Sequence, residues 1–381
     1  SWTLPSHMTL LTGQGIFEHG VITEHQRLPL AATTLPEVLR GAGYRTFGVV
    51  GGPYLEARYG YAQGFEHYDD YTVVAESNEE SHRGVTSPRL VSLTLDWLKR
   101  WEGSGTPFFV FLHLWDVHHD YTPPPPYDTL FDPGYDGPIT GENFAWGHEY
   151  DPPMDAEDLE HLQALYDGEI AFTDRHLARL LDWLRSRDLL ERTVVVITAD
   201  HGDEFFEHGE RGHRNNLYDE TLLVPLVFRY PAALPRGSVV SAPVRLQDVA
   251  PTILEIAGLG PVHGFGALSP DDPLAGRSLL PVQQLLPRPA SGGLLGTSSF
   301  LRQPEAKVIV TAQGSMRLYD LREDPGEQVD LAPHERERAR ALAGQLLQHR
   351  ERTEALRGTA APGTDDDADR KELLRSLGYV D

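Results

Sequence analysis

Segments with helical spacing of apolar residues alternate with short, almost wholly apolar runs through the first two thirds of the chain. The helical spacing predicts helices over Thr34–Ala42, from Pro88 to about Trp101, and over roughly Ala156–Arg187. The apolar runs predict buried strands over Tyr44–Val50, Phe108–Leu114, Thr193–Thr198 and Leu223–Arg229. This alternation is typical of an α/β fold, in which a mostly parallel central sheet is flanked by helices.

The pattern changes beyond residue 260. Residues 261–293 are rich in Pro, Gly, Leu and Ser, which is typical of a loop or linker. A hairpin is predicted from the two short strands Lys307–Thr311 and Met316–Tyr319, and a charged amphipathic helix is predicted over Glu335–Arg357. We therefore expect an α/β domain over residues 1–260 and a small C-terminal subdomain, an antiparallel sheet with a helix, over residues 294–381.

Composition narrows the class of protein. The chain has 381 residues and a formal net charge of −24, so its surface repels phosphate backbones and nucleic acid is not an expected partner. A small anionic substrate is compatible with this charge, because a metal ion reverses the field inside a pocket. The absence of cysteine excludes disulfides, thiolate metal sites and cysteine nucleophiles. Membrane association, oligomeric state and cellular compartment stay open.

Asp and His residues follow two of the predicted strands directly. Asp200 and His201 come after Thr193–Thr198, and His118 and His119 come soon after Phe108–Leu114. Ligands of parallel sheets gather at the carboxyl ends of the strands, so these side chains are expected near one another. Asp200 and His201 could hold one divalent ion, or could cap a helix and lie on the surface. The imidazoles could bind metal or substrate, donate a proton, or pack on neighbouring aromatic rings.

Two further segments carry candidate chemistry. His213 and Arg214 follow Gly212 in a loop, where cationic side chains suit an anionic ligand, although a solvated loop explains them equally. At the amino terminus, Thr3 lies in Thr3-Leu4-Pro5-Ser6-His7. A hydroxyl at a helix N-terminus is well placed to become an attacking alkoxide, and the simpler interpretation is a helix cap.

The order of these motifs resembles the sulfatase family of the alkaline phosphatase superfamily. The family's nucleophile motif is similar to Thr3-Leu4-Pro5-Ser6-His7 with Thr12-Gly13, and its metal-binding pair is similar to Asp200-His201. Later matches are Leu217-Tyr218-Asp219-Glu220, Val224-Pro225-Leu226, Leu318-Tyr319-Asp320-Leu321 and Asp324-Pro325-Gly326-Glu327. The resemblance covers nearly the whole chain.

The resemblance implies a metal-dependent hydrolase of sulfate or phosphate esters. It implies a divalent ion (Ca²⁺, Mg²⁺, Mn²⁺ or Zn²⁺) held by Asp200, His201 and the Thr3 hydroxyl. Thr3 would be the nucleophile, with His7, His118 and His213 as further catalytic residues. Arg214 and His118 would bind the substrate, a small anionic ester.

The chain departs from the family pattern in two respects. The family's metal-binding aspartates lie on a strand before the nucleophile; we expect that strand to be missing and the chain to be an amino-terminally truncated fragment. Thr3 replaces the family's Cys or Ser, so no formylglycine is expected there, and His7 replaces the usual Arg. Thr in this frame is closer to the superfamily's phosphodiesterases. The alternatives are therefore a phosphodiesterase or phosphotransferase of the superfamily, or a catalytically degenerate paralogue.

Overall fold

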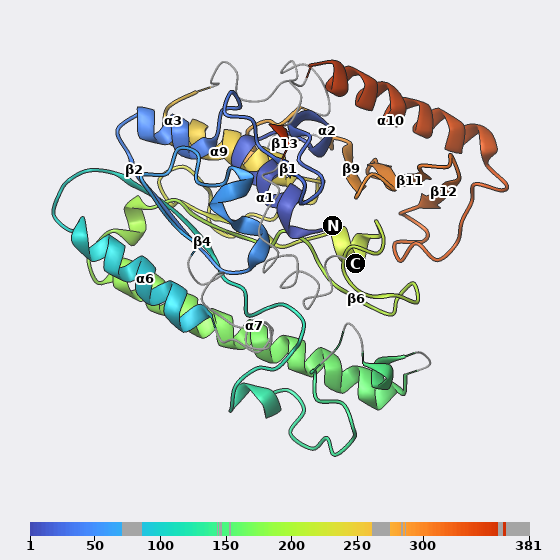
Figure 1. Cartoon of the computed structure of the whole chain (residues 1–381), viewed down its shortest axis with the longest axis horizontal. Helices are drawn as coiled ribbons and strands as arrows, with labels where there is room; N and C mark the ends of the chain where they lie inside the picture. The colour runs from blue at the N-terminus through green and yellow to red at the C-terminus, as the bar shows by residue number, and fades with distance from the viewer. Residues whose placement is uncertain are drawn as a thin grey trace.

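A computed structural model describes residues 1–70, 86–142, 144, 147–151, 154–260, 275–282, 285, 287–356 and 361–362. Strands lie between two layers of helices, with α1 (Thr3–Thr12), α3 (Leu35–Gly41) and α9 (Val249–Ile256) on one side and α6 (Ser87–Arg100) and α7 (Ala156–Arg185) on the other (Figure 1). None of the helices in these ranges combines the length and apolar character needed to cross a bilayer.

The first sheet has the order β3-β2-β4, with both pairs parallel. Its strands are β2 (Arg45–Val50), β3 (His67–Asp69) and β4 (Phe108–His113). Helix α3 begins at a capping box: the Thr34 hydroxyl accepts a hydrogen bond from Glu37 N, and the Glu37 carboxylate accepts one from Thr34 N. The predicted α/β fold with a parallel sheet is confirmed, and the element bounds differ from the expected ones only at the ends.

The second pair of strands is antiparallel. β5 (Val195–Thr198) pairs with β8 (Leu226–Arg229), so Ile197 lies opposite Val227. Among the described residues no strand joins β4 to β5, and a cavity of about 1410 Å³ lies between their edges. Thr3, His7, Asp200 and His201 line this cavity. The carboxyl ends of β4 and β5 therefore face the same space.

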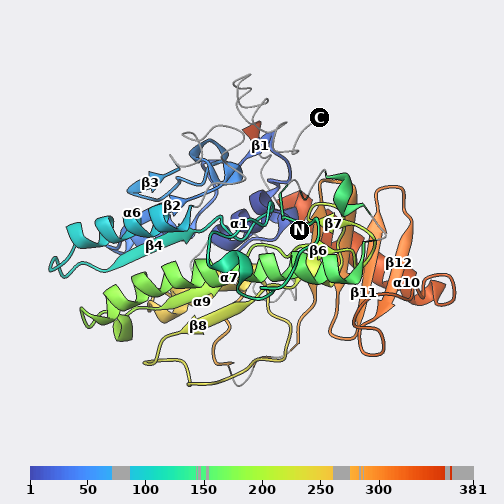
Figure 2. The same ribbon diagram turned by 90° about the horizontal axis from the view of Figure 1, so that it is seen from below.

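The C-terminal region is an antiparallel sheet of order β12-β11-β10-β9. Its strands are β9 (Ala290–Leu294), β10 (Ser298–Arg302), β11 (Ala306–Thr311) and β12 (Met316–Asp320). The helix α10 (Arg336–Leu356) packs on it through Leu342 and Leu346, and Phe17 of α2 (Ile16–His19) joins the same core. Seen from below, this sheet and α10 lie at one end of the molecule, away from α6 and β4 (Figure 2).

The predicted hairpin of the C-terminal region is present as β11 and β12. The range 261–293 was expected to be linker, but its last four residues belong to β9, which begins at Ala290. The glycines of β9 do not prevent this strand, because its backbone pairs with that of β10. Much of the expected linker lies outside the described residues. The remaining strands and the short helix α8 are β1 (Gln26–Arg27), β6 (Glu204–Phe205), β7 (Arg211–Gly212), β13 (Ala361–Pro362) and α8 (Asp219–Leu222).

Candidate active site

The Thr3 hydroxyl lies at the first turn of α1. Trp2 before it is extended, and Thr3 is the first helical residue, with only 3% of its surface exposed. Its Oγ1 lies 3.4 Å from Nε2 of His201. The exposed backbone N–H groups of a helix start favour negative charge at this position. The two segments that the sequence analysis expected to meet, 198 residues apart in the chain, are therefore in contact.

Asp200 and His201 lie just past the end of β5, as predicted. Asp200 Oδ2 lies 3.3 Å from His201 Nε2 and 3.5 Å from His7 Nδ1. This carboxylate oxygen is buried and has no hydrogen-bond partner. His201 Nδ1 lies 3.0 Å from the carbonyl oxygen of Gly202; because a carbonyl only accepts, Nδ1 carries the proton and Nε2 has the lone pair. Such an orphaned oxygen is what a bound cation would satisfy.

His113, the last residue of β4, belongs to the same cluster. Its Nδ1 lies 2.7 Å from the carbonyl oxygen of Gly51, and its ring centroid is 4.8 Å from that of His7. His7, His113 and Asp200 each offer a ligand atom, and these atoms lie within 4.8 Å of one another. The sequence analysis did not single out His113, although its place at the end of a predicted strand was a visible signal.

Burial and neighbouring charges together set the protonation states of His113, His201 and Asp200. Loss of hydration lowers the pKa of His113 to about 3 and that of His201 to about 4. For Asp200, burial by itself would raise the pKa, but the nearby His201, His7 and His113 outweigh it and hold the pKa below its usual value. At neutral pH one ionised carboxylate therefore lies beside neutral His113 and His201. These residues fit a divalent cation, because its ligands must be deprotonated.

His213 is held by a second carboxylate. Its Nδ1 lies 2.7 Å from Asp203 Oδ1, and the other oxygen of Asp203 accepts a hydrogen bond from the Tyr121 hydroxyl at 2.5 Å. Burial opposes ionisation of Asp203, but the contact with His213 and the nearby His201 keep its pKa below the usual value. The carboxylate therefore fixes the imidazole with Nε2 free to take or give a proton. The His213 and His201 ring centroids lie 4.1 Å apart.

His118, in the segment that follows β4, lies close to His213. Its ring stacks on Trp115, with centroids 3.9 Å apart, and lies 5.2 Å from the ring of His213. Its Nδ1 donates to the carbonyl oxygen of His119 at 2.5 Å, which leaves Nε2 with the lone pair. His118 therefore packs on an aromatic ring and also lies beside the other imidazoles. Packing against Trp115 is thus compatible with a role of His118 in substrate binding or proton transfer.

Asp116 does not take part in the cluster. Its carboxylate accepts hydrogen bonds from the backbone N–H and hydroxyl groups of both Thr86 and Ser87, at the start of α6. With those contacts it caps a helix. Both of its oxygens accept hydrogen bonds there, so neither is left for a cation.

Arg214 lies against the start of α1. Its guanidinium is 4.3 Å from the ring centroid of Trp2, and its Nη1 donates to the Tyr54 hydroxyl at 3.2 Å. Its backbone φ of 70° is rare for a residue with a side chain. Arg214 therefore places a positive charge next to the residue that precedes Thr3.

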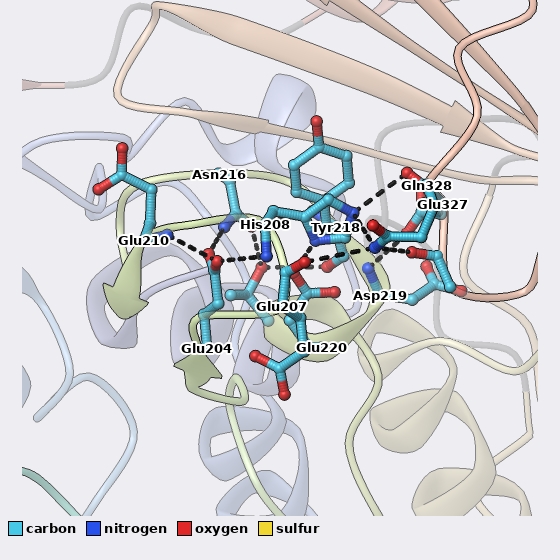
Figure 3. A network of polar contacts seen from close by, with 12 residues as sticks. Glu204, Glu207, His208, Glu210, Asn216, Tyr218, Asp219, Glu220, Glu327 and Gln328 are labelled. Atoms are coloured by element: carbon cyan, nitrogen blue, oxygen red, sulfur yellow. Dashed lines mark hydrogen bonds and ion pairs between the residues drawn. The ribbon is translucent and has the colours of Figure 1, made fainter. Parts of the chain in front are cut away.

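A polar network holds segment 204–216, which carries His213 (Figure 3). Glu204 is its centre: Oε1 accepts from the backbone N of His208 and of Glu210, at 2.7 and 2.8 Å, and Oε2 accepts from Asn216. Glu204 is fully buried. The loop is therefore fixed by a carboxylate whose oxygens are all in use.

The C-terminal sheet reaches this network through Lys307 of β11. Lys307 Nζ is completely buried and lies 2.9 Å from Asp219 Oδ1 and 2.9 Å from Glu327 Oε1. Asp219 begins α8, and the next residue, Glu220, contacts His208 Nδ1 at 2.6 Å. The far sheet is thus linked by charge to the segment that carries His213.

Comparison with known proteins identifies the family. The family model described as Sulfatase matches residues 1–259, so this chain belongs to the sulfatase family. Arylsulfatase K of Danio rerio is 31% identical over 192 residues, which are 46% of this chain and 35% of that protein. An ulvan-active sulfatase of Formosa agariphila is 24% identical over 86% of this chain and 67% of its own length. The chain spans about a third of the length of the arylsulfatase K relatives it matches.

Solved structures share the fold. A protein solved in complex with its substrate D-glucosamine-2-N,6-O-disulfate has a TM-score of 0.70 and 19% identity, and the match covers 96% of this chain and 90% of that one. A phosphonate monoester hydrolase from Silicibacter pomeroyi has a TM-score of 0.71 and 21% identity, over 93% and 86% of the two chains. Both confirm the expected sulfatase-like fold.

Proposed function

We propose that this protein is a metal-dependent hydrolase of phosphate or sulfate esters in which the Thr3 hydroxyl is the nucleophile. The observation that carries the proposal is the 3.4 Å between Thr3 Oγ1 and His201 Nε2. It puts a hydroxyl at a helix start beside a buried carboxylate and an imidazole that suit a cation. A small anionic ester would enter through the cavity that Thr3, His118, Asp200 and His201 line.

A divalent cation bound by Asp200 and His201 would lower the pKa of a neighbouring hydroxyl and offset charge on the ester oxygens. Thr3 Oγ passes its proton to Nε2 of a neutral imidazole, His118 or His213, and forms a bond to phosphorus or sulfur, while the bond from that atom to the leaving oxygen breaks. The leaving oxygen takes this proton from the imidazole. Water then attacks the phosphorus or sulfur and gives a proton to the imidazole, the bond from that atom to Thr3 Oγ breaks, and the imidazole returns the proton to Thr3 Oγ. Arg214 would add positive charge near the substrate oxygens.

Phosphate esters suit this nucleophile better than sulfate esters. Threonine does not form the formylglycine that the sulfatase resemblance associates with Cys or Ser, so an ester on Thr3 must be released by direct hydrolysis. Phosphonate monoester hydrolases share the fold. Sulfate ester hydrolysis is the second candidate, favoured by the family match and by relatives whose names refer to sulfatase activity.

The test is an assay of aryl phosphate, bis-aryl phosphate and aryl sulfate hydrolysis. We expect Thr3→Ala to lower kcat by a factor on the order of 10³ or more, as loss of a nucleophile does. Thr3→Ser should keep part of the activity, and Thr9→Ala, on the same helix, should keep nearly all of it. Equal activity of the Thr3→Ala and Thr9→Ala variants would exclude Thr3 as nucleophile. A wild-type protein inactive on all three esters with each of Zn²⁺, Mn²⁺ and Ca²⁺ would indicate a degenerate paralogue, and transfer to an added alcohol would indicate a phosphotransferase.

A further inference from the structure

We propose that His118, His119 and His213 bind a second divalent ion, Zn²⁺ in the first instance, and that this ion inhibits the enzyme. The inhibition rests on the proposed function, whereas binding of the ion is measurable without any substrate. The group of His7, His113 and Asp200 contains none of these three histidines. The second ion therefore has a site of its own, next to the cation of the proposed function.

The three imidazoles form one compact, buried group. One ring nitrogen of each lies within 4.8 Å of those of the other two. The ring centroid of His119 is 4.2 Å from that of His118 and 5.2 Å from that of His213, and the rings of His118 and His213 are 5.2 Å apart. Ligands of one tetrahedral zinc ion, with bonds of about 2.0–2.1 Å, lie about 3.3 Å apart. Small rotations about the side-chain bonds bring the three nitrogens to that spacing.

Hydrogen bonds at Nδ1 orient two of the rings. The Nδ1 of His118 donates to the carbonyl oxygen of His119 at 2.5 Å, and the Nδ1 of His213 lies 2.7 Å from Asp203 Oδ1. A carbonyl or an ionised carboxylate only accepts, so each Nδ1 carries the proton and each Nε2 of the neutral ring has the lone pair. Metal-binding histidines are held in this way, by a carbonyl or a carboxylate at the second nitrogen.

Asp203 supports the ion from behind His213. Its Oδ1 accepts from His213 Nδ1 and its Oδ2 accepts from the Tyr121 hydroxyl at 2.5 Å, so both carboxylate oxygens are already in use. The spacing of Asp203, His201 and His213 also suits a metal, but that group would first have to break these contacts. A carboxylate behind an imidazole makes its other nitrogen a better ligand. The geometry therefore favours the three-histidine group.

Three imidazoles decide which ions bind. Imidazole nitrogen suits Zn²⁺ and other late transition ions, whereas Ca²⁺ and Mg²⁺ prefer oxygen ligands. A zinc ion with three protein ligands keeps its fourth position for water. In the proposed function the Nε2 atoms of His118 and His213 take and give the proton of the reaction. An ion on these atoms occupies the lone pairs that proton transfer needs, so hydrolysis slows as the site fills.

The first experiment counts bound metal without substrate. The full chain is stripped with a chelator and titrated with Co²⁺, which gives intense visible absorption in a tetrahedral nitrogen site and faint bands in an octahedral oxygen site. The Asp200→Asn variant is the background, because it loses the carboxylate of the first site and keeps the three histidines. His119→Phe is added to it, since a phenyl ring still packs on Phe144 but offers no ligand. His148→Phe is the matched control, because that side chain is 98% exposed.

We expect Asp200→Asn to bind about one Co²⁺ with intense absorption, through three nitrogens. Adding His119→Phe should weaken this binding by about tenfold or more, and adding His148→Phe should leave it within about twofold. Equal Co²⁺ affinity of the two double variants would overturn the inference, as would faint bands in Asp200→Asn. The same two substitutions in the wild-type chain, with bound Zn²⁺ counted by elemental analysis, replace any double variant that does not fold.

The second experiment measures inhibition on whichever of the three esters the protein hydrolyses. The enzyme is supplied with Mn²⁺, Zn²⁺ is added stepwise, and the rate of each variant is divided by its own rate without zinc. We expect His119→Phe to need about tenfold more Zn²⁺ for half inhibition than the wild type and His148→Phe. Identical inhibition of His119→Phe and His148→Phe would overturn the regulatory role.

The two experiments separate this inference from the proposed function. A protein that hydrolyses none of the three esters removes the proposed function and the inhibition with it, while the Co²⁺ titration still decides the metal site. A protein that hydrolyses an ester, but whose Co²⁺ binding does not depend on His119, removes only this inference.

Discussion

Among the described residues, four groups of side chains have the spacing of a metal site, and two of them differ in whether a carboxylate oxygen lacks a hydrogen bond. His7, His113 and Asp200 form the first group, and Glu204, His208 and Glu220 form the second. In the first, Asp200 Oδ2 has no hydrogen bond. In the second, which Figure 3 shows, the oxygens of Glu204 accept from backbone and amide donors, and both ring nitrogens of His208 have partners.

The difference shows what spacing alone leaves undecided. Buried polar atoms that already have partners gain little from a cation, which would first have to break those contacts. A buried carboxylate oxygen without a partner keeps the full cost of its lost hydration, and a cation removes that cost. The first group therefore suits the cation of the proposed function, and the second is a brace between segment 204–216 and the C-terminal sheet.

The brace gives the largest expected effect. Lys307→Ala removes the ammonium group between Asp219 and Glu327, so both buried carboxylates lose their contact with Lys307. We expect the free energy of unfolding to fall by about 3–5 kcal/mol, measured by urea denaturation. Lys99→Ala is the matched control, because Lys99 pairs with Asp96 at the surface and such pairs contribute about 1 kcal/mol or less. Equal free energies of unfolding for Lys307→Ala and Lys99→Ala would show that the contacts of Lys307 do not stabilise the fold.

The next effect concerns catalysis at His213. In Asp203→Asn an amide replaces the carboxylate that accepts from His213 Nδ1, so the imidazole is no longer held in one tautomer. We expect kcat to fall by about 100-fold, or about 3 kcal/mol, the lower end of acid–base catalysis because His118 remains. KM and the unfolding midpoint should change little. A variant with unchanged kcat would show that His213 transfers no proton.

A third prediction concerns pH and the buried Glu169 of α7. Burial raises the pKa of Glu169 well above its usual value of 4.5, although its Oε1 accepts a hydrogen bond from Thr122 N at 2.9 Å. The folded state therefore holds this proton more tightly than the unfolded state. Its contribution to stability is complete below pH 4.5 and is lost as the pH rises toward the folded-state pKa, by about 1.4 kcal/mol per pH unit.

Glu169→Gln tests that dependence directly. The amide keeps a neutral, hydrogen-bonding side chain at every pH, so the variant should lose this part of the decline in stability toward alkaline pH. Thermal unfolding of both proteins between pH 5 and pH 9, at about one-unit steps, measures it. Parallel curves for the two proteins would mean that Glu169 is ionised in the folded state.

The smallest effect is an expected absence of change. His208→Asn removes a ring from the second group, and because His208 shares no partner with Asp200, the affinity for a divalent cation, with Mn²⁺ as the probe, should stay within about twofold of the wild type. Calorimetry beside an Asp200→Asn variant measures it. A loss as large as that of Asp200→Asn would show that the second group also binds the ion and would remove the distinction between the two regions.

Much of the fold and part of the site were predictable from local patterns. The period of the hydrophobic residues predicted β2, β4, β5 and α7. The order of the motifs predicted that Thr3 lies close to Asp200 and His201. The roles of Asp116 and His113 were not predicted, because both lie near the end of one strand and nothing in their neighbours along the chain separates them. Asp116 meets the start of α6, whose N–H groups use its oxygens, whereas His113 faces His7 and Asp200.

The sequence alone predicted the order of helices and strands, the family, and the residues whose chemistry suits an ester and a cation. These predictions were possible because the period of hydrophobic residues and the order of motifs can be read directly along the chain. Only folding decided which of those groups keep a free lone pair. That choice depends on donors brought from distant segments, such as Thr86 to Asp116 or Lys307 to Asp219, and no local pattern contains them. Asp200 is left with an unpaired oxygen for the same reason.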